Sequence, residues 1–381
     1  MKFLHIGDLH LGRTLGEFDL QEDQKYILDQ IFHIAQERGV DAVLIAGDVY
    51  DKSVPAERAV LLLDEFLKKL SGVGIKVFLI SGNHDSDERL GFGSSFFETH
   101  GVYINTVYNG EIYRRSFTDE YGEVNIWLLP FVKASAVKAV FPNEEIADYD
   151  QAFRVIMNHA KVDGLQRNVL VAHQFVAGSG AEIRMAGSEN AAVQNVGLVD
   201  QIGADCFDDF DYVALGHIHS AQRAGREEVR YCGSPLKYSV KETHNEKTVT
   251  LVNLKEKGDA DIELIPLKPL RDLRHLKGGL KQILNKANIT NPEDFVYVTL
   301  TDETIINDSM NIIRQYYPNT VKLDYENSHT RELESADFAV VDEEKSFTEL
   351  FSDFYRQMYG CEPGEAERKM TEEAARDAGI V

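Results

Sequence analysis

Side chains of the kinds that bind metal ions occur in five short motifs, each directly after a hydrophobic run. The motifs are Asp8-Leu9-His10, Gly47-Asp48, Gly82-Asn83-His84-Asp85, His173 and Gly216-His217-Ile218-His219. Carboxylate, amide and imidazole groups suit divalent cations such as Mn²⁺ or Fe²⁺, and the lack of a thiolate in the set argues against a Cys-based zinc site. The sequence therefore predicts a metal site with the candidate ligands Asp8, His10, Asp48, Asn83, His173, His217 and His219.

Two neighbouring cations held by such a set could clamp a phosphoryl group for in-line attack. A carboxylate can bridge two ions, and Asp48 is the natural candidate because its strand is expected to be central. His84 need not bind metal, since a histidine beside the scissile phosphate can stabilise developing charge or protonate the leaving oxygen. Such a histidine needs an orienting partner, and either Asp51 or Asp85 could supply it. For Asp85, a capping or turn role is an equal alternative.

The hydrophobic runs before the motifs are the elements that must position them. These runs are rich in Val, Ile and Leu and cover residues 3–6, 42–46, 77–80, 169–172 and 212–215. Short apolar runs bounded by glycine or polar residues predict buried strands. Apolar residues at helical spacing over 24–38 and 55–70 predict helices between the first three strands, which is typical of a parallel α/β core. Ligands bind at the carboxyl ends of such strands, so the motifs should meet at one edge.

The middle of the chain predicts smaller elements. Residues 102–108, 111–117 and 124–129 fit short strands, and Asn109-Gly110 is a dipeptide typical of a tight hairpin turn. A helix is expected around 146–161. Residues 175–203 are rich in Gly, Ala, Ser and Asn and predict a long loop near the site, because long loops in compact domains are often functional.

After residue 267 the motifs stop. The pattern predicts a helix over 273–286, a strand over 295–301, a helix over 305–316 and a strand over 321–325. Ser346 and Glu349 fit a capping box at the start of a further helix that would end at Gly360. We therefore expect a catalytic domain over 1–268, a small α+β domain over 269–330 and an acidic helical segment over 331–381.

Charge and cysteine content narrow the class of protein. The formal net charge is −23, and residues 332–381 hold 14 acidic against 5 basic residues. Such a chain does not favour DNA binding through its own basic surface, although bound divalent cations change the local sign of the potential. No apolar stretch approaches the ~20 residues of a membrane span. The three cysteines are odd in number and widely spaced, which favours a reducing cytosol and predicts a cytoplasmic protein.

The order of the motifs resembles that of the calcineurin-like metallophosphoesterases: Asp-x-His, Gly-Asp-x-x-Asp, Gly-Asn-His-Asp, a lone His and Gly-His-x-His. Within that superfamily the chain is similar to the SbcD family, the nuclease subunits of bacterial SbcCD complexes and relatives of double-strand-break repair nucleases. The finer likeness is carried by Gly7-Asp8-Leu9-His10-Leu11-Gly12, Gly47-Asp48-Val49-Tyr50-Asp51 with Pro55, Gly82-Asn83-His84-Asp85 and Tyr231-Cys232-Gly233-Ser234-Pro235. The resemblance implies a β-sandwich flanked by helices, with a small α+β domain that caps DNA and a helical tail.

The resemblance also implies roles for single residues. One metal would be held by Asp8, His10, Asp48 and His219, and the other by Asp48, Asn83, His173 and His217, with Mn²⁺ as the expected ion. His84 takes the position of the catalytic histidine. At Asp51 some archaeal relatives carry a second histidine, so the aspartate here matches the phosphatase-like version and is expected to orient His84.

The implied activity is cleavage of DNA phosphodiesters in repair, recombination and replication. It would combine a 3′→5′ exonuclease on double-stranded ends with an endonuclease on single strands and hairpins. The sequence has no Gly-x-x-x-x-Gly-Lys-[Ser/Thr] loop, so ATP dependence would come from a partner. By resemblance that partner is an SbcC-like coiled-coil ATPase, and the nuclease chain pairs with itself to form a heterotetramer.

Other interpretations stay open. The same scaffold could be a phosphatase or phosphodiesterase acting on small or protein substrates, although Lys52-Ser53 follows the second motif where protein phosphatases carry Arg-Gly. A scaffold without activity is disfavoured because every ligand position is filled. Arg184, Lys237 and Lys241 could contact DNA phosphates or lie on a solvated surface. The apolar stripe that starts at Phe347 could pack on its own domain or dock on the partner.

Overall fold

The computed structural model describes residues 1–178, 183–185, 201–328, 346–359 and 362–377. The chain divides into two compact units, Met1–Leu273 and Arg274–Val381. The rest of the loop predicted over 175–203, and parts of the acidic segment predicted over 331–381, lie outside the described residues. The division into three parts stays a prediction.

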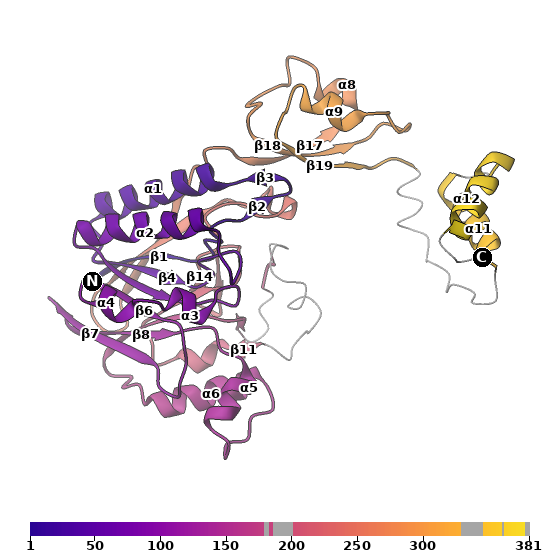
Figure 1. Cartoon of the computed structure of the whole chain (residues 1–381). Helices are drawn as coiled ribbons and strands as arrows, with labels where there is room; N and C mark the ends of the chain where they lie inside the picture. The colour runs from indigo at the N-terminus through magenta and orange to yellow at the C-terminus, as the bar shows by residue number, and fades with distance from the viewer. Residues whose placement is uncertain (179–182, 186–200, 329–345, 360–361, 378–381) are drawn as a thin grey trace. The chain divides into compact units, whose positions relative to one another are not determined.

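Two six-stranded sheets form the first unit (Figure 1). The first has the order β16-β15-β1-β4-β5-β6 and the second the order β13-β14-β12-β9-β8-β7. The strands of the first sheet are β1 Lys2–Ile6, β4 Ala42–Ala46, β5 Lys76–Ile80, β6 Val102–Asn105, β15 Thr248–Leu254 and β16 Ala260–Pro266. Those of the second are β7 Tyr113–Asp119, β8 Gly122–Leu129, β9 Arg167–His173, β12 Tyr212–Gly216, β13 Gln222–Ala224 and β14 Arg226–Tyr231.

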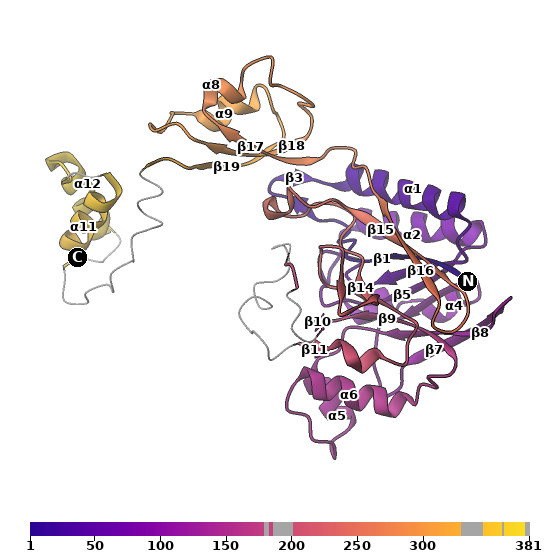
Figure 2. The same cartoon turned by 180° about the vertical axis from the view of Figure 1, so that it is seen from behind.

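Helices cover the outer faces of both sheets (Figures 1 and 2). On the first sheet lie α1 Gln21–Arg38 and α2 Glu57–Gly72, which bury the apolar stripes predicted from their spacing. On the second lie α5 Ala134–Val140 and α6 Tyr149–Ala160. The predicted β-sandwich flanked by helices is therefore confirmed. The shorter elements are β2 Thr14–Leu15, β3 Phe18–Asp19, α3 Asp87–Leu90, α4 Ser94–Glu98, β10 Val176–Ala177, β11 Ile202–Gly203, η2 Ala204–Phe207 and η3 Val240–Glu242.

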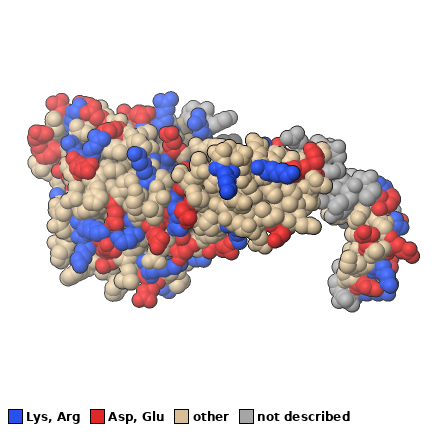
Figure 3. Space-filling view, turned by 90° about the horizontal axis from the view of Figure 1, so that it is seen from above, with Lys and Arg blue, Asp and Glu red and all other residues tan. Residues whose placement is uncertain are grey.

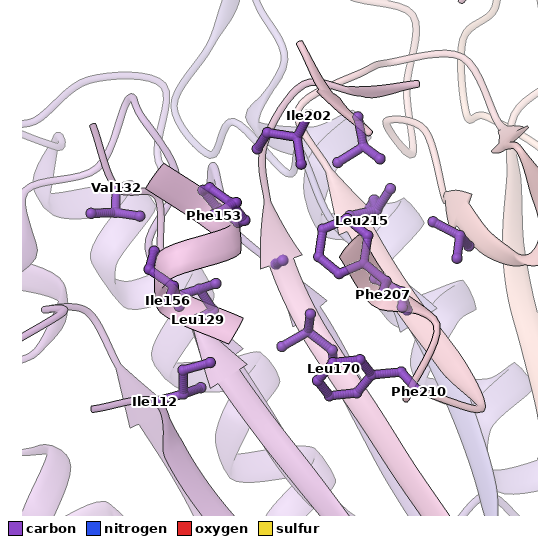
Figure 4. Close-up of a cluster of buried hydrophobic side chains, with 14 of the residues drawn as sticks. Ile112, Leu129, Val132, Phe153, Ile156, Leu170, Ile202, Phe207, Phe210 and Leu215 are labelled. Atoms are coloured by element: carbon purple, nitrogen blue, oxygen red, sulfur yellow. The ribbon is translucent and has the colours of Figure 1, made fainter. Parts of the chain in front are cut away.

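Apolar side chains hold these layers together. The space between the sheets is filled from both sides, by residues that include Phe3, Leu44, Phe78, Ile126, Val171 and Tyr212. A second cluster lies between the outer face of the second sheet and α6, where Phe153 and Ile156 contact a layer that includes Leu129, Leu170 and Leu215 (Figure 4). Because both faces of the central strands are buried, their sequences are continuous hydrophobic runs without alternation.

One predicted turn was wrong. Asn109-Gly110 does not join two paired strands, because β6 belongs to the first sheet and β7 to the second. The hairpin of this region joins β7 to β8 instead, and Asp119 pairs with Gly122 at its tip. Gly122 has a φ of 100°, which suits a tight turn at that position.

The second unit contains a three-stranded sheet with the order β17-β18-β19. Its strands are β17 Leu273–Gly278, β18 Phe295–Leu300 and β19 Thr320–Tyr325, and its short helices are α8 Leu280–Ile283 and α9 Ser309–Arg314. The helix predicted over 273–286 was therefore wrong, since its first half is a strand. Leu273, Leu276, Leu280 and Ile283 have helical spacing, but Gly278-Gly279 separates them into two elements and Gly278 has a φ of 157°.

Two helices follow near the C-terminus, α11 Phe347–Tyr359 and α12 Glu365–Asp377. The predicted capping box is present, because the Ser346 main-chain N–H donates to the Glu349 carboxylate at 2.9 Å. Arg356 donates to Glu362 at 2.6 Å and so ties the end of α11 to the linker before α12. No helix in the described part of the chain is both long and apolar enough to cross a membrane.

Candidate metal centre

The motifs meet because the strands before them run parallel and end together. β1, β4 and β5 are parallel neighbours in the first sheet, and β9 and β12 are parallel neighbours in the second. Their carboxyl ends carry Asp8, Asp48, Asn83, His173 and His217. Three overlapping groups of possible ligands result, each within 4.8 Å: Asp8 with His10 and His219, His10 with Asp48 and His84, and Asp8 with Asp48 and His173.

The backbone of these loops is unusual, which indicates a built site. Asp8, His10, Asp48 and His217 have φ values of 50°, 42°, 48° and 96°, in the left-handed region that non-glycine residues rarely adopt. Main-chain hydrogen bonds hold the first three in place. The Asp8 N–H donates to the Gly47 carbonyl at 3.0 Å, and the His10 N–H donates to the Asp48 carbonyl at 3.0 Å.

One half of the site is formed by Asp8, His10 and His219. The two histidine Nε2 atoms lie 3.1 Å apart, so both ring edges point to the same place. Asp8 Oδ1 accepts a hydrogen bond from the His217 N–H at 2.9 Å, whereas Oδ2 is buried without a hydrogen-bond partner in the described chain. A buried carboxylate oxygen without a donor is costly unless a cation completes it.

The other half is formed by Asn83, His173 and His217. Asn83 Oδ1 lies 3.0 Å from His173 Nε2 and 3.0 Å from His217 Nδ1. His173 Nδ1 donates to the Ala46 carbonyl at 2.7 Å, which leaves Nε2 as the ring atom that faces the centre. Ala46 was not expected in the site, because a main-chain carbonyl leaves no sequence signal.

Asp48 lies between the two halves. Its Oδ2 is 3.7 Å from His10 Nε2 and 3.5 Å from His173 Nε2, while its Oδ1 accepts a hydrogen bond from the His84 N–H at 2.9 Å. Gly82 allows this approach, since a Cβ atom there would lie 2.2 Å from Asp48 Oδ1. The arrangement fits the predicted bridging position of Asp48.

Burial and close packing shift the pKa values of these groups in opposite directions. Burial opposes ionisation of Asp48, but His173 and His10 outweigh it and hold its pKa well below the usual value. Burial also opposes protonation of His173, yet Asp48 and Asp8 raise its pKa to about 9. Burial, with His173 close by, lowers the pKa of His217 to about 3. Burial raises the pKa of Asp8. Such opposed shifts within one cluster are typical of functional sites.

His84 lies at the rim of the centre, with its ring edge-to-face on His10 at a centroid distance of 4.9 Å. Its Nδ1 is 3.0 Å from the main-chain carbonyl of Asp51. Asp51 therefore contacts the histidine, as expected, but through its main chain. Its carboxylate accepts a hydrogen bond from Arg13 at 2.9 Å, a partner that was not predicted.

Asp85 holds two loops of the site together through its carboxylate. Its carboxylate accepts hydrogen bonds from three main-chain N–H groups, those of Gly82 at 2.9 Å, Val49 at 3.1 Å and Tyr50 at 2.8 Å. Burial raises its pKa to about 6. Asp85 thus joins the loop after β4 to the loop after β5.

Distant residues that the motifs did not reveal support the His10 loop. Gln24 donates to the His10 carbonyl at 2.7 Å and accepts from the Gly12 N–H at 3.0 Å. The Tyr238 hydroxyl donates to the Leu9 carbonyl at 2.5 Å. Local sequence could not identify these residues, because they lie 14 and 229 positions from the groups they bind.

A buried ion pair supports His219 in the same way. Lys247 donates to the His219 carbonyl at 3.0 Å and to Glu242 at 2.5 Å. Glu242 Oε1 is in turn 3.9 Å from His219 Nδ1. Burial of Glu242 opposes ionisation, but Lys247 lowers its pKa to about 2.

The three basic residues Arg184, Lys237 and Lys241 differ in their surroundings. Lys237 is engaged internally, since its ammonium donates to the carbonyls of Thr243 and Leu273 at 3.0 and 3.1 Å and pairs with Asp272 at 2.8 Å. Arg184 and Lys241 are exposed. A phosphate contact by Lys237 would therefore require these bonds to break.

Comparison with known proteins places the chain in a family. The calcineurin-like phosphoesterase family matches residues 1–221, and the family described as type 5 capsule protein repressor C-terminal domain matches residues 269–359. A relative from Staphylococcus epidermidis, named as the D component of the nuclease SbcCD, is 32% identical over 327 residues, which cover 85% of each chain.

Solved structures that match the chain share little sequence with it. A protein from Thermus thermophilus is 11% identical with a TM-score of 0.38, and the alignment covers 69% of this chain and 98% of that one. A dimetal phosphatase from Danio rerio is also 11% identical with a TM-score of 0.38, over 70% and 96% of the two chains.

The divalent metal ions that this family implies fit the residues present. The centre combines a buried, unpartnered Asp8 oxygen with histidine nitrogens aimed at the same point, and hard divalent cations accept both donor types. The chain therefore belongs to the calcineurin-like phosphoesterases and, within them, to the SbcD family of nucleases, which makes it a metal-dependent hydrolase.

Proposed function

We propose that the protein is a Mn²⁺-dependent DNA nuclease subunit. It would cut double-stranded ends as a 3′→5′ exonuclease and single strands or hairpins as an endonuclease, in DNA repair, recombination and replication. The observation that carries the proposal is the position of Asp48, with one carboxylate oxygen between His10 and His173 and the other on the His84 N–H. Two divalent ions that share one carboxylate, beside a histidine outside the ligand set, would suit phosphodiester hydrolysis.

The proposed ligands divide between the two halves of the centre. Asp8, His10, Asp48 and His219 would hold one ion, and Asp48, Asn83, His173 and His217 the other. When bound, two divalent ions supply a water nucleophile at neutral pH and neutralise charge on the phosphoryl group.

The remaining work falls to His84. Its Nδ1 is held by the Asp51 carbonyl, and we assign the contact with the substrate to its other ring nitrogen, Nε2. From there it can stabilise the developing charge or donate a proton to the leaving oxygen.

A partner would supply the ATP dependence and the basic DNA-binding surface. The net charge is −23, and basic and acidic side chains are intermixed on the face seen in Figure 3, among the described residues. The relative from Staphylococcus epidermidis takes its name from a complex of more than one kind of chain. We therefore propose an SbcC-like coiled-coil ATPase as the partner that provides ATP dependence and a basic surface for DNA, within a heterotetramer that contains two copies of this chain.

The acidic C-terminal segment is the proposed docking element. α11 has an apolar stripe that includes Leu350, Phe351 and Phe354, and Phe354 remains 55% exposed. An amphipathic helix with an exposed aromatic side chain suits a groove on a partner.

A direct assay tests the activity. The chain is purified alone and with the ATPase, supplied with Mn²⁺, and offered end-labelled duplex and hairpin DNA beside the phosphomonoester p-nitrophenyl phosphate. We expect DNA cleavage that Asp48→Asn abolishes and His84→Gln lowers by about 100-fold or more, with negligible phosphomonoester turnover. Brisk phosphomonoester turnover without DNA cleavage would instead favour a phosphatase.

A further inference from the structure

Arg13 lies beside the metal centre and takes no part in the proposed ligand set. It follows the Asp8–His10 loop directly, and its main-chain N–H donates to the His10 carbonyl at 3.0 Å. Its guanidinium donates from Nη1 to Asp51 Oδ1 at 2.9 Å and lies over the Tyr238 ring, 5.3 Å from the ring centroid. The side chain is 19% exposed, so the group is held but can be reached from solvent.

Both groups that hold the guanidinium contact the metal-facing histidines. Asp51 Oδ1 is 3.8 Å from His10 Nδ1, and the Tyr238 ring centroid lies 5.5 Å from that of His10 and 6.1 Å from that of His219. Arg13 is therefore fixed on the His10–His219 side of the centre.

Most of the donors of Arg13 remain unused. A guanidinium carries five N–H groups and stays charged at all ordinary pH values. Within the described chain, the single hydrogen bond of this side chain is the one from Nη1 to Asp51. A structural role alone thus accounts poorly for a fixed cation at this place.

The positive charge of Arg13 beside the metal centre also needs an explanation. A guanidinium next to a site for divalent cations is repelled by them unless anions balance it. Asp51 balances the charge of the guanidinium itself, and a substrate phosphate would balance excess positive charge of the neighbouring cations. The planar fork of arginine suits phosphate oxygens, which it can bind through two parallel hydrogen bonds.

We propose that Arg13 binds a phosphate oxygen of the substrate strand and that Asp51 positions it for this task. The inference rests on the proposed function and deepens it. Asp51 then has two roles, because its carboxylate holds Arg13 while its main-chain carbonyl holds His84. Asp51 therefore fixes Arg13, which would bind the phosphate, relative to His84, which would act on the leaving oxygen.

The test compares Arg13→Gln and Arg13→Lys with the wild-type full-length protein, in complex with the ATPase where activity requires it. Arg38→Gln is the matched control, because Arg38 also forms a carboxylate pair, with Glu263 at 2.8 Å, but at the end of α1 near the start of β1. With saturating Mn²⁺, KM and kcat are measured on a labelled single-stranded oligonucleotide and on bis-p-nitrophenyl phosphate. Inorganic phosphate is used as a competing anion.

For Arg13→Gln we expect the oligonucleotide KM and the phosphate inhibition constant to rise about 10- to 100-fold, the effect of losing a charge-assisted hydrogen bond. The kcat should change much less, the bound Mn²⁺ should stay at the wild-type level, and Arg13→Lys should fall between the two. Asp51→Asn should raise KM in the same direction, and the double variant should be no worse than Arg13→Gln alone. Arg38→Gln should match the wild type.

The two substrates identify which phosphate is bound. A raised KM on both indicates the reacting phosphate, and a raised KM on the oligonucleotide alone indicates a neighbouring one. Unchanged KM and phosphate inhibition in Arg13→Gln, or loss of Mn²⁺ from that variant, would overturn the inference. If the wild type fails to cut DNA, the proposed function fails, while phosphate binding measured by calorimetry on the Mn²⁺-loaded protein still tests Arg13.

Discussion

Asp48 accepts a hydrogen bond from the main-chain N–H of His84 at 2.9 Å, through the carboxylate oxygen that does not face His10 and His173. The proposed bridging ligand thus also fixes the loop that carries the proposed catalytic histidine. Metal binding and His84 placement are coupled through one side chain.

Asp48→Asn should therefore disturb both the binding of metal and the placement of His84. An amide is a poor bridge between cations, and its NH₂ group would face either the His84 N–H or the metal site. We expect bound Mn²⁺ to fall below two per chain, affinity to fall by at least about 100-fold, and cleavage to disappear. Calorimetry measures the Mn²⁺ affinity, and elemental analysis measures the bound Mn²⁺. Asp64→Asn, on the exposed face of α2, is the control and should bind Mn²⁺ normally. Normal Mn²⁺ content in Asp48→Asn would contradict the bridge.

The main-chain contact between Asp51 and His84 separates the roles of these residues. His84→Gln should lower kcat by about 10²- to 10⁴-fold, the usual contribution of a general acid, and leave Mn²⁺ bound. Asp51→Ala keeps the carbonyl that holds His84 Nδ1, so its kcat should fall by less than about 10-fold. Single-turnover cleavage measures both. An equal loss of kcat in the two variants would mean that the Asp51 carboxylate orients the histidine after all.

Glycine at position 82 should be required by packing. A Cβ atom there would lie 2.2 Å from Asp48 Oδ1 and 2.3 Å from its main-chain nitrogen. We expect Gly82→Ala to cost about 1–3 kcal/mol of unfolding free energy, through overpacking, and to reduce Mn²⁺ binding strongly. Gly72→Ala is the matched control, since nothing lies within 4 Å of its Cβ position in α2. It should be neutral or stabilise by up to about 1 kcal/mol. Urea unfolding in EDTA measures both variants, and a Gly82→Ala protein as stable and as active as Gly72→Ala would contradict the packing.

The pair of Asp119 and Arg167 should make stability depend on acid pH. Burial opposes ionisation of Asp119, but the Arg167 guanidinium holds its pKa below the ordinary 3.8. A depressed pKa in the folded state adds stability above the unfolded value, and this stability is lost as the pH falls from about 3.8 toward the folded pKa.

Asp119→Asn should accordingly destabilise the protein by about 1–3 kcal/mol at pH 7 and by clearly less at pH 3, measured by urea unfolding in EDTA. Asp209→Asn, an exposed residue, serves as control. A difference that stays constant between the two pH values would exclude this ion pair as its source.

Deletion of residues 347–381 should abolish assembly with the ATPase and leave the first unit folded. Phe354→Asp should weaken assembly by about 10-fold or more, because burying a charge in an apolar groove is costly. Leu165→Asp is the control, since Leu165 is 89% exposed in the first unit, away from the tail in sequence. Gel filtration and calorimetry measure the complex. Intact assembly after the deletion would reject the docking proposal.

The sequence by itself predicted the chemistry of the centre and the strands that carry it. Asp8, Asp48 and His173 each follow a short, continuous apolar run, the pattern of a buried strand, and parallel strands bring their ends together. The apolar spacing of α1 and α2 was equally informative, because a helix packed on a sheet must repeat every three to four residues. Both signals are local, so one sequence suffices to find them.

Tertiary structure decided which groups complete the centre. The Ala46 carbonyl behind His173, the Asp51 carbonyl behind His84 and the Gln24 amide behind His10 depend on how two sheets and their loops face each other. Asn109-Gly110 shows the same limit, since the strands on either side of this turn dipeptide belong to different sheets. Local patterns carry the propensity of a segment, but its partners are chosen by contacts between residues far apart in the chain, whose energies exceed those of local preference.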